Sequence, residues 1–253
     1  MPNPHLHDLH AWASSPGRLA IAAAVTLGFA LLARALRGVN GPGTLAGGLA
    51  CFLLFAGAGP TAFAALAALF IMTWISTRLG YRRKLALGVA ERREGRNAWQ
   101  VLANLSIAAA GAVFFSTTGN RIWLVAAMAA LAEAATDTVA SEIGQTRRPE
   151  ARLITTWKRV PAGTDGGITI PGSIAGVAAG LAIAAVATVG GMIRPAQLWI
   201  PVAAGFAGML IDSILGAMLQ RRGWISNQAV NFCATLAAAV LALAILELTK
   251  NLP

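Results

Sequence analysis

Residues 121–144 read RIWLVAAMAALAEAATDTVASEIG, an apolar run of helical length that ends among carboxylates. A helix needs about 20 predominantly apolar residues to cross the hydrocarbon core of a bilayer, and this run is long enough. Its last part contains Glu133, Asp137 and Glu142, three of only ten acidic residues in the chain. Ionised carboxylates are costly in a membrane. The stretch therefore predicts both a transmembrane helix and a functional site near one end of it.

The composition extends this interpretation to the whole chain. Of 253 residues, 57% are hydrophobic and 12% are charged, whereas soluble domains carry about 25% charged residues. Long runs of Ala, Leu, Ile, Val and Gly are typical of helical spans, and a transmembrane barrel would show alternating segments of about ten residues. We therefore predict an all-α fold, a polytopic transmembrane helical bundle formed by residues 1–253 as a single domain.

Apolar windows and helix-breaking residues predict eight helices, within a range of seven to nine. The approximate spans, after a short N-terminal tail at 1–17, are 18–37, 43–59, 60–79, 98–116, 121–144, 171–190, 195–220 and 228–249. The second span is short and rich in glycine, so we expect it to be re-entrant or buried in the bundle. Only the connections 80–97 and 145–170 are long, so any chemistry must use helix ends and these two loops.

The basic residues are distributed unevenly over this topology. With Arg78 and the connections 34–42, 80–97, 145–170 and 221–227 on one side, that side has 16 Lys and Arg residues and the other side has four. Basic residues concentrate on the cytoplasmic side of membrane proteins, so we predict cytoplasmic loops and non-cytoplasmic termini in a bacterial plasma membrane. The net charge of +10 is then explained by topology, and nucleic-acid binding is not predicted.

The carboxylates of the opening stretch are the strongest candidates for a site. Glu133 and Asp137 are four residues apart and share a helical face, whereas Glu142 shares a second face with Thr138, about 100° around the helix. Carboxylates within a transmembrane segment are typical of a cation site, a proton path or a divalent-metal site. Pairing with a loop arginine that holds the bundle together is the alternative. Glu133 lies deeper and is the less certain member.

Three other helices carry polar residues near the same predicted membrane level. They are Asn97, Gln100 and Asn104 on the fourth span, Asp212 and Ser213 on the seventh, and Asn227 and Asn231 on the last. Amides of this kind also serve as hydrogen bonds between helices, worth about 1 kcal/mol each. The ladder Gly172, Gly176 and Gly180 is more typical of close helix packing.

The loop at 147–173 reads RRPEARLITTWKRVPAGTDGGITIPGS and combines basic residues with a glycine-rich turn. Backbone N–H groups in such a turn can cradle phosphate oxygens, and Lys158 and Arg159 would neutralise their charge. The turn comprises Gly163, Thr164, Asp165, Gly166 and Gly167. Asp165 is a candidate to join Asp137 or Glu142 in holding Mg²⁺, which takes carboxylates together with substrate phosphates. A solvated basic loop that serves only topology is the alternative.

The predicted topology brings these clusters, which come from separate helices, to one membrane boundary. Random placement would scatter them along the helices. We therefore predict a site that faces the cytoplasm and is open to lipid.

Five segments occur in the order seen in one integral membrane family: GRNAWQVLAN (95–104), ATDTVASEIG (135–144), KRVPAGTDGGIT (158–169), LIDSILGAMLQ (210–220) and NQAVNF (227–232). Over about residues 78–232 the chain resembles this family, which includes the phytyl-phosphate kinase of plants and cyanobacteria. The resemblance implies transfer of a phosphoryl group from a nucleoside triphosphate, with CTP favoured, to an isoprenoid monophosphate such as phytyl or geranylgeranyl phosphate. Asp165 departs from the Asn of many members, and Trp157 from a smaller residue.

The resemblance and the residue chemistry together assign roles. A monophosphate acceptor is already anionic, so catalysis consists of positioning and charge neutralisation and needs no strong base. The predicted catalytic residues are Asp137, Glu142, Lys158 and Arg159, and the predicted Mg²⁺ ligands are Asp137, Glu142 and Asp165. The predicted substrate- and nucleotide-binding residues are Asn97, Gln100, Asn104, Ser141, Arg82, Lys84, Gly163, Thr164, Asp165, Gly166, Gly167, Asp212, Ser213, Asn227 and Asn231.

Other functions stay open at this point. A lipid alcohol kinase or cytidylyltransferase would need a base for its acceptor, for which Asp137 or Asp212 is the available kind of residue. A secondary transporter would use the carboxylates as proton or cation sites and would show inverted repeats and broken midplane helices. No repeat relates the two halves, and the polar residues gather at one boundary, which favours an enzyme.

Overall fold

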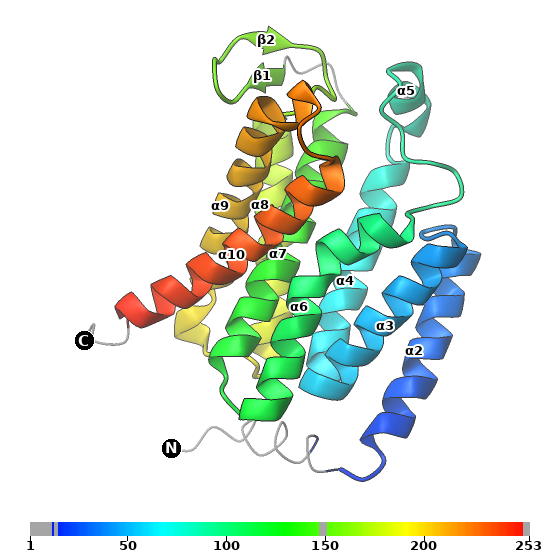
Figure 1. Ribbon diagram of the computed structural model, residues 1–253, viewed down its shortest axis with the longest axis vertical. Coiled ribbons are helices and arrows are strands. Elements are labelled where there is room, and N and C mark those ends of the chain that lie inside the picture. Colours follow the sequence, from blue (N-terminus) through cyan, green and yellow to red (C-terminus); the bar gives the residue numbers. More distant parts are fainter. Residues whose placement is uncertain (1–11, 13–14, 147–150, 250–253) are drawn as a thin grey trace.

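The structure, a computed structural model, describes residues 12, 15–146 and 151–249 and shows a helical bundle (Figure 1). Within these residues, eight helical segments are long and apolar enough to cross a membrane. The long helices are α2 (Arg18–Ala35), α3 (Gly41–Ala58), α4 (Pro60–Arg78), α6 (Ala98–Thr118), α7 (Ile122–Gly144), α8 (Ile170–Val189), α9 (Trp199–Met218) and α10 (Asn227–Thr249). The predicted polytopic fold is confirmed. The second span, α3, is a helix of 18 residues, nine of which are buried.

Local chemistry explains where these helices begin. The side chain of Asn40 accepts a hydrogen bond from the Gly43 N–H at 2.9 Å and so caps α3. Asn97 caps α6 in the same way and forms a reciprocal capping box with Gln100. Between α3 and α4, Gly59 adopts a φ of +85° that favours glycine. These caps place the polar start of α6 at the loop end of the bundle.

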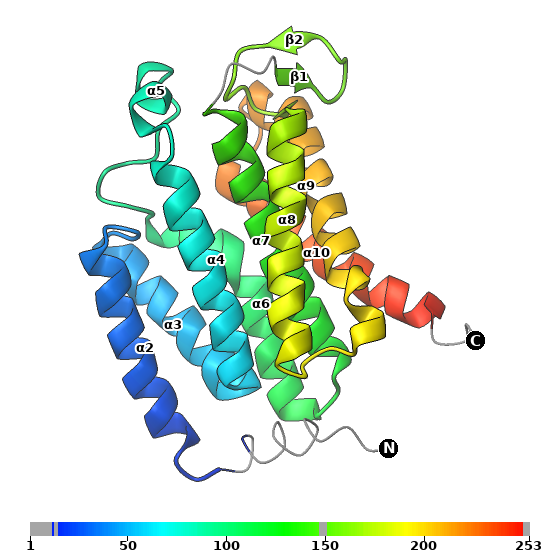
Figure 2. The same cartoon turned by 180° about the vertical axis from the view of Figure 1, so that it is seen from behind.

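Helix α7 is the centre of the bundle and packs against α4, α6, α8, α9 and α10 (Figures 1 and 2). Small residues on its neighbours permit this packing. Gly172, Gly176 and Gly180 bring α8 so close that a Cβ on Gly176 would lie 2.6 Å from the carbonyl oxygen of Thr136. Helix α9 approaches α7 in the same way at Gly205. The predicted packing role of the glycine ladder is therefore confirmed.

Helices α2, α3 and α4 lie together on one side of the bundle (Figure 2). Helix α2 packs on α3 and reaches α4 through Phe29, whose ring centroid lies 5.3 Å from that of Phe63 and 5.4 Å from that of Phe70. Nearer the loops, the indole N–H of Trp74 donates to the carbonyl oxygen of Leu36 at 3.0 Å. A few side chains therefore join α2 to α4.

Both long connections contain elements that the sequence pattern did not predict. The first contains a short helix, α5 (Tyr81–Ala86). The second contains β1 (Ala151–Leu153), β2 (Arg159–Val160) and β3 (Gly167–Ile168), which form an antiparallel sheet in the order β2-β1-β3. Arg152 of β1 lies opposite Arg159 on one side and Ile168 on the other. The sheet fixes the glycine-rich turn, which lies between β2 and β3.

The four connections that hold most of the basic residues lie at the same end of the bundle, where α5 and the sheet project (Figure 1). This arrangement has the predicted alternation of helix directions, and the cytoplasmic orientation stays a prediction. The predicted tail at 1–17 lies largely outside the described residues, as do Arg147, Arg148 and Lys250.

Candidate active site

A polar cavity of 280 Å³ lies at the loop end of the bundle, beside α6, α7, α9 and α10 and next to the glycine-rich turn. Its walls are formed by residues from segments that are far apart in the sequence. The predicted site residues that line it are Gln100, Asn104, Asp137, Ser141, Glu142, Gly163, Thr164, Asp165, Gly166, Gly167, Asp212, Ser213, Asn227 and Asn231. The structure therefore brings most of the predicted residues together.

Carboxylates of α7 and α9 concentrate negative charge in this cavity. Asp137 and Asp212 both line it and lie close enough for their charges to repel. Glu133 lies deeper, 1% exposed, and its Oε1 atom has no hydrogen-bond partner among the described residues. Gly208 allows this approach, because a Cβ there would lie 2.5 Å from Cγ of Glu133. A buried carboxylate such as Glu133, next to two half-buried ones, requires a compensating cation or proton.

Amides from α6 and α10 hold one of these carboxylates in place. The hydrogen-bond network orients the Asn231 amide so that its nitrogen donates to Oδ2 of Asp212 and its oxygen accepts from Nδ2 of Asn104, each at 3.2 Å. Nδ2 of Asn104 also donates to the carbonyl oxygen of Gln100 at 2.8 Å. These amides therefore link helices, as the alternative interpretation expected, and they also position Asp212.

The glycine-rich turn packs directly on α9. Gly166 has a φ of +76°, and a Cβ there would lie 2.6 Å from the carbonyl oxygen of Ser213, so only glycine permits this contact. Asp165 precedes it in the wall of the cavity. Burial of its carboxyl raises the pKa of Asp165 above the ordinary value, and the positive charge of Arg221 opposes part of that shift. The turn thus brings a third carboxyl group close to Asp212.

Glu142 lines the polar cavity, but both of its carboxylate oxygens already have partners outside it. Its Oε2 atom accepts from the Lys84 ammonium at 2.5 Å, and its Oε1 atom accepts from the Thr77 hydroxyl at 3.0 Å. Lys84 is fully buried and also donates to the carbonyl oxygens of Ser76 and Thr77, at 2.9 and 2.7 Å. Glu142 is five positions after Asp137, which places the two carboxylates on different faces of α7. Lys84 and Glu142 therefore link α4, α5 and α7, and Lys84 lines neither cavity.

Four more predicted residues do not line the polar cavity. Asn97 uses its side chain to accept from the Gln100 N–H at 3.1 Å. Lys158 and Arg159 are exposed. Arg82 is exposed on α5. The predicted phosphate-neutralising role of these basic residues is therefore not supported by their positions.

A second cavity, of 460 Å³, lies between α2, α3, α4 and α6 and was not predicted. Apolar side chains such as Phe29, Leu66 and Phe70 line it. Its loop end is lined by five arginines, Arg37, Arg78, Arg92, Arg93 and Arg96. Cavities of this size and lining are typical of ligand sites. The sequence signal was the run ERREGR at 91–96, which the topological interpretation had explained as charge that orients the helices.

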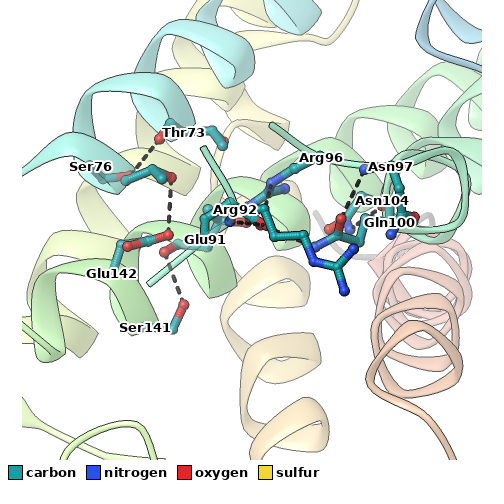
Figure 3. Close-up of polar contacts among 12 residues, drawn as sticks. Thr73, Ser76, Glu91, Arg92, Arg96, Asn97, Gln100, Asn104, Ser141 and Glu142 are labelled. Carbon is teal, nitrogen blue, oxygen red and sulfur yellow. Dashed lines mark hydrogen bonds and ion pairs between the residues drawn. The ribbon is translucent and has the colours of Figure 1, made fainter. Parts of the chain in front are cut away.

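The two cavities meet at Glu91, Arg96 and Asn104, which line both of them (Figure 3). Oε2 of Glu91 accepts from Nε2 of Gln100 at 3.0 Å and lies 3.9 Å from Nε of Arg96. The Arg96 guanidinium donates to the Thr138 hydroxyl at 3.4 Å. Thr138 directly follows Asp137, the carboxylate of α7 that lines the polar cavity. The two cavities therefore adjoin at these residues, and we call them the apolar arm and the polar arm.

The polar arm has the donor chemistry of a magnesium site that is completed by a ligand. Among the described residues, no three Asp, Glu, His or Cys side chains form a group that could hold a metal ion by themselves. Mg²⁺, however, is usually bound by one or two carboxylates, with water and phosphate oxygens in the other positions. Asp137 and Asp212 supply such carboxylates. They fit an ion bound jointly with a phosphate, with Asp212 in the role predicted for Glu142.

A polytopic bundle of helices that are long and apolar enough to cross a membrane, with two cavities at its loop end, defines the class of integral membrane proteins. The chain belongs to the family described as integral membrane protein DUF92, whose sequence profile matches residues 24–239. No solved structure matches the chain.

Three relatives show how far this similarity extends. An uncharacterised membrane protein of Synechocystis sp. is 32% identical over 79% of each chain. The chloroplastic protein VTE6 of Arabidopsis thaliana is 32% identical over 77% of this chain and 61% of its own length. An uncharacterised membrane protein of Methanocaldococcus jannaschii is 30% identical over 88% of this chain and 92% of its own. The predicted membership of an integral membrane family is therefore shown.

Proposed function

We propose that this chain is a membrane-embedded phosphotransferase that transfers a phosphoryl group from a nucleoside triphosphate, with CTP favoured, to an isoprenoid monophosphate such as phytyl or geranylgeranyl phosphate. The observation that supports it best is the junction of the two cavities. An apolar cavity bordered by arginines meets a polar cavity bordered by carboxylates and a glycine-rich turn. An isoprenoid phosphate has the same division into an apolar chain and an anionic head.

The proposal assigns one substrate to each arm. The isoprenoid chain occupies the apolar cavity and reaches it from the lipid between α2 and α4. Its phosphate lies among Arg92, Arg93 and Arg96, because guanidinium groups bind phosphate through paired, charge-assisted hydrogen bonds. The nucleotide occupies the polar cavity, with its phosphates at the glycine-rich turn. The site faces the cytoplasm of a bacterium, which supplies the nucleotide.

The reaction needs charge neutralisation more than it needs a base. An oxygen of the acceptor phosphate attacks the γ-phosphorus and forms the new P–O bond, while the bond to the β-phosphate breaks and its electron pair leaves with the nucleoside diphosphate. The attacking oxygen is already ionised, so no proton is removed. Arg96 at the junction offsets the repulsion between the two anions. Mg²⁺ held by Asp137 and Asp212 together with phosphate oxygens would supply further neutralisation.

Family membership supports the coarse part of this proposal. The segments that resemble the phytyl-phosphate kinase family, ATDTVASEIG, GTDGG and LIDSILG among them, contribute the walls of the polar cavity. The polar wall is thus formed largely by the segments on which the resemblance rests, which favours a shared chemistry. The isoprenoid chain, the nucleotide and Mg²⁺ are part of the proposal.

The test is a direct assay of the purified protein in lipid nanodiscs with geranylgeranyl or phytyl monophosphate, Mg²⁺ and each nucleoside triphosphate in turn. We expect the isoprenoid diphosphate, formed fastest with CTP and lost when Mg²⁺ is chelated. Asp137→Asn should abolish it, whereas Glu94→Gln, an exposed position of the same loop end that lines neither cavity, should not. Absence of diphosphate with every nucleotide would overturn the proposal. The same assay with geranylgeraniol tests an alcohol kinase.

Glu133 favours a second candidate, a proton- or cation-coupled transporter. Its buried carboxyl, without a partner at Oε1, extends the carboxylates from the cavity towards the centre of the bundle. Carboxylates placed in this way are typical of ion paths. Proteoliposomes with an internal pH dye would show a flux that Glu133→Gln abolishes. A wild-type protein without flux under proton or sodium gradients would exclude this candidate.

A further inference from the structure

Glu91 opposes the charge of the junction that surrounds it. Among the described residues that line the apolar cavity, it is the one acidic residue beside five arginines. Its side chain is 18% exposed and that of Arg96 is 21% exposed, so both groups are largely removed from water. Nε of Arg96 and Oε2 of Glu91 lie 3.9 Å apart, which makes them a long ion pair and not a hydrogen bond. Phosphate binding alone would be stronger without this negative charge.

Backbone contacts hold both charges at the junction. The carbonyl oxygen of Arg96 accepts from the Asn40 N–H at 3.0 Å, which joins the first loop to the connection between α2 and α3. Gly95 permits this with a φ of +85°, and a side chain there would collide with the backbone of that connection. The Tyr81 hydroxyl donates to the carbonyl oxygen of Glu91 at 3.2 Å. Glu91 is therefore a fixed neighbour of whatever anion Arg96 binds.

We propose that Glu91 is a specificity-determining residue that lowers the affinity of the junction for a diphosphate more than its affinity for a monophosphate. The inference rests on the proposed function, in which the acceptor is a monophosphate and the product a diphosphate. The Coulomb energy scales with the product of the charges, so Glu91 repels the more highly charged product more strongly than the acceptor. The acceptor can then bind to the arginines, while the product is released.

The experiment compares two ligands on one protein. Binding of geranylgeranyl monophosphate and geranylgeranyl diphosphate is measured by calorimetry on the full chain in nanodiscs, without nucleotide. Glu91→Gln removes the charge and keeps the shape; its one amide oxygen can still accept from Gln100, while the contact of the second oxygen with the Arg92 N–H is lost. We expect about fivefold tighter binding of the diphosphate and about twofold tighter binding of the monophosphate, the scale of partly solvated charge pairs. Glu94→Gln makes the same charge change in the same loop and should leave both affinities unchanged.

Turnover gives a second measurement. In Glu91→Gln, added diphosphate should inhibit more strongly, kcat should fall because product release slows, and the acceptor KM should fall as well. Glu91→Ala separates charge from shape: a change in the monophosphate-to-diphosphate affinity ratio that both variants share belongs to the charge.

Every other outcome overturns the inference about Glu91. Equal changes in both affinities, or the same changes in Glu91→Gln and Glu94→Gln, overturn the role of Glu91 and leave the proposed function intact. Loss of the folded protein in both Glu91 variants would make the residue structural and also overturn the inference. A wild-type protein that binds neither isoprenoid phosphate overturns the proposed function and this inference together.

Discussion

The two arms of the site are built in different ways. The polar arm takes most of its charged and amide groups from α6, α7, α9 and α10, and several of these groups bond to one another. The apolar arm lies between α2, α3, α4 and α6, and most of its arginines belong to connections, not to helices. Groups on packed helices keep a fixed geometry, whereas exposed loop side chains such as Arg92 and Arg93 adapt to a ligand. The difference assigns the chemistry to the polar arm and the binding of the acceptor to the other.

The largest effect that tests this contrast is expected at Asp137. Asp137→Asn keeps the shape of the side chain and removes its charge, so kcat should fall about 100- to 1000-fold, the scale seen when one preorganised electrostatic contact is removed. Binding of geranylgeranyl monophosphate, measured without nucleotide, should stay within about twofold of wild type because the acceptor lies in the other arm. A loss of acceptor affinity with unchanged kcat would move Asp137 to the binding arm.

The next largest effect is expected at Glu142, where Glu142→Gln tests whether this carboxylate stabilises the fold or takes part in the reaction. Because the fully buried ammonium of Lys84 loses its carboxylate, the free energy of unfolding should fall by about 3 kcal/mol. Thermal unfolding in detergent, compared with wild type, measures the change. In the double variant Glu142→Gln with Lys84→Met, part of this stability should return, since no unpaired charge is left.

A different result for Glu142 would restore its predicted role. If Glu142→Gln unfolded at the wild-type temperature but required a much higher Mg²⁺ concentration for activity, the carboxylate would be a metal ligand after all.

The arginines of the apolar arm should give a smaller, ligand-specific effect. Arg92→Gln with Arg93→Gln should raise the acceptor KM about tenfold and leave the nucleotide KM unchanged, because partly solvated charge-assisted contacts are worth about 1 kcal/mol each or less. The matched control is Lys158→Gln with Arg159→Gln, which removes two exposed charges at the start of β2 and next to it. If the control raised the nucleotide KM, the predicted role of Lys158 and Arg159 would be restored.

The sequence predicts the fold and the polar arm for physical reasons. Eight apolar windows determine the helices because a bilayer permits few other structures. Amides and carboxylates at helical spacing near one boundary place Asn104, Asp137, Asp212 and Asn231 at the same level, and packing around α7 then brings them together. Helical periodicity within each segment is sufficient for this step.

The apolar arm and the partner of Glu142 depend on tertiary contacts that periodicity does not encode. Arg96 reaches the junction because Gly95 allows its backbone to join the connection between α2 and α3. Glu142 meets Lys84 because α5 folds back towards α7. Lys158 is close to the turn in sequence, but it is exposed and does not line the polar cavity. In the loops, closeness in sequence therefore does not predict closeness in space.

The smallest expected effect concerns pH and the glycine-rich turn. Burial raises the pKa of Asp165 and Arg221 opposes that shift, so removing the arginine charge should raise the pKa further. If the ionised carboxyl supports Mg²⁺–nucleotide binding, the acidic limb of a plot of nucleotide affinity against pH should move to higher pH in Arg221→Gln. It should not move in Arg221→Gln with Asp165→Asn, which lacks the titrating group. A shift that persists in the double variant would mean that Arg221 acts on the nucleotide itself.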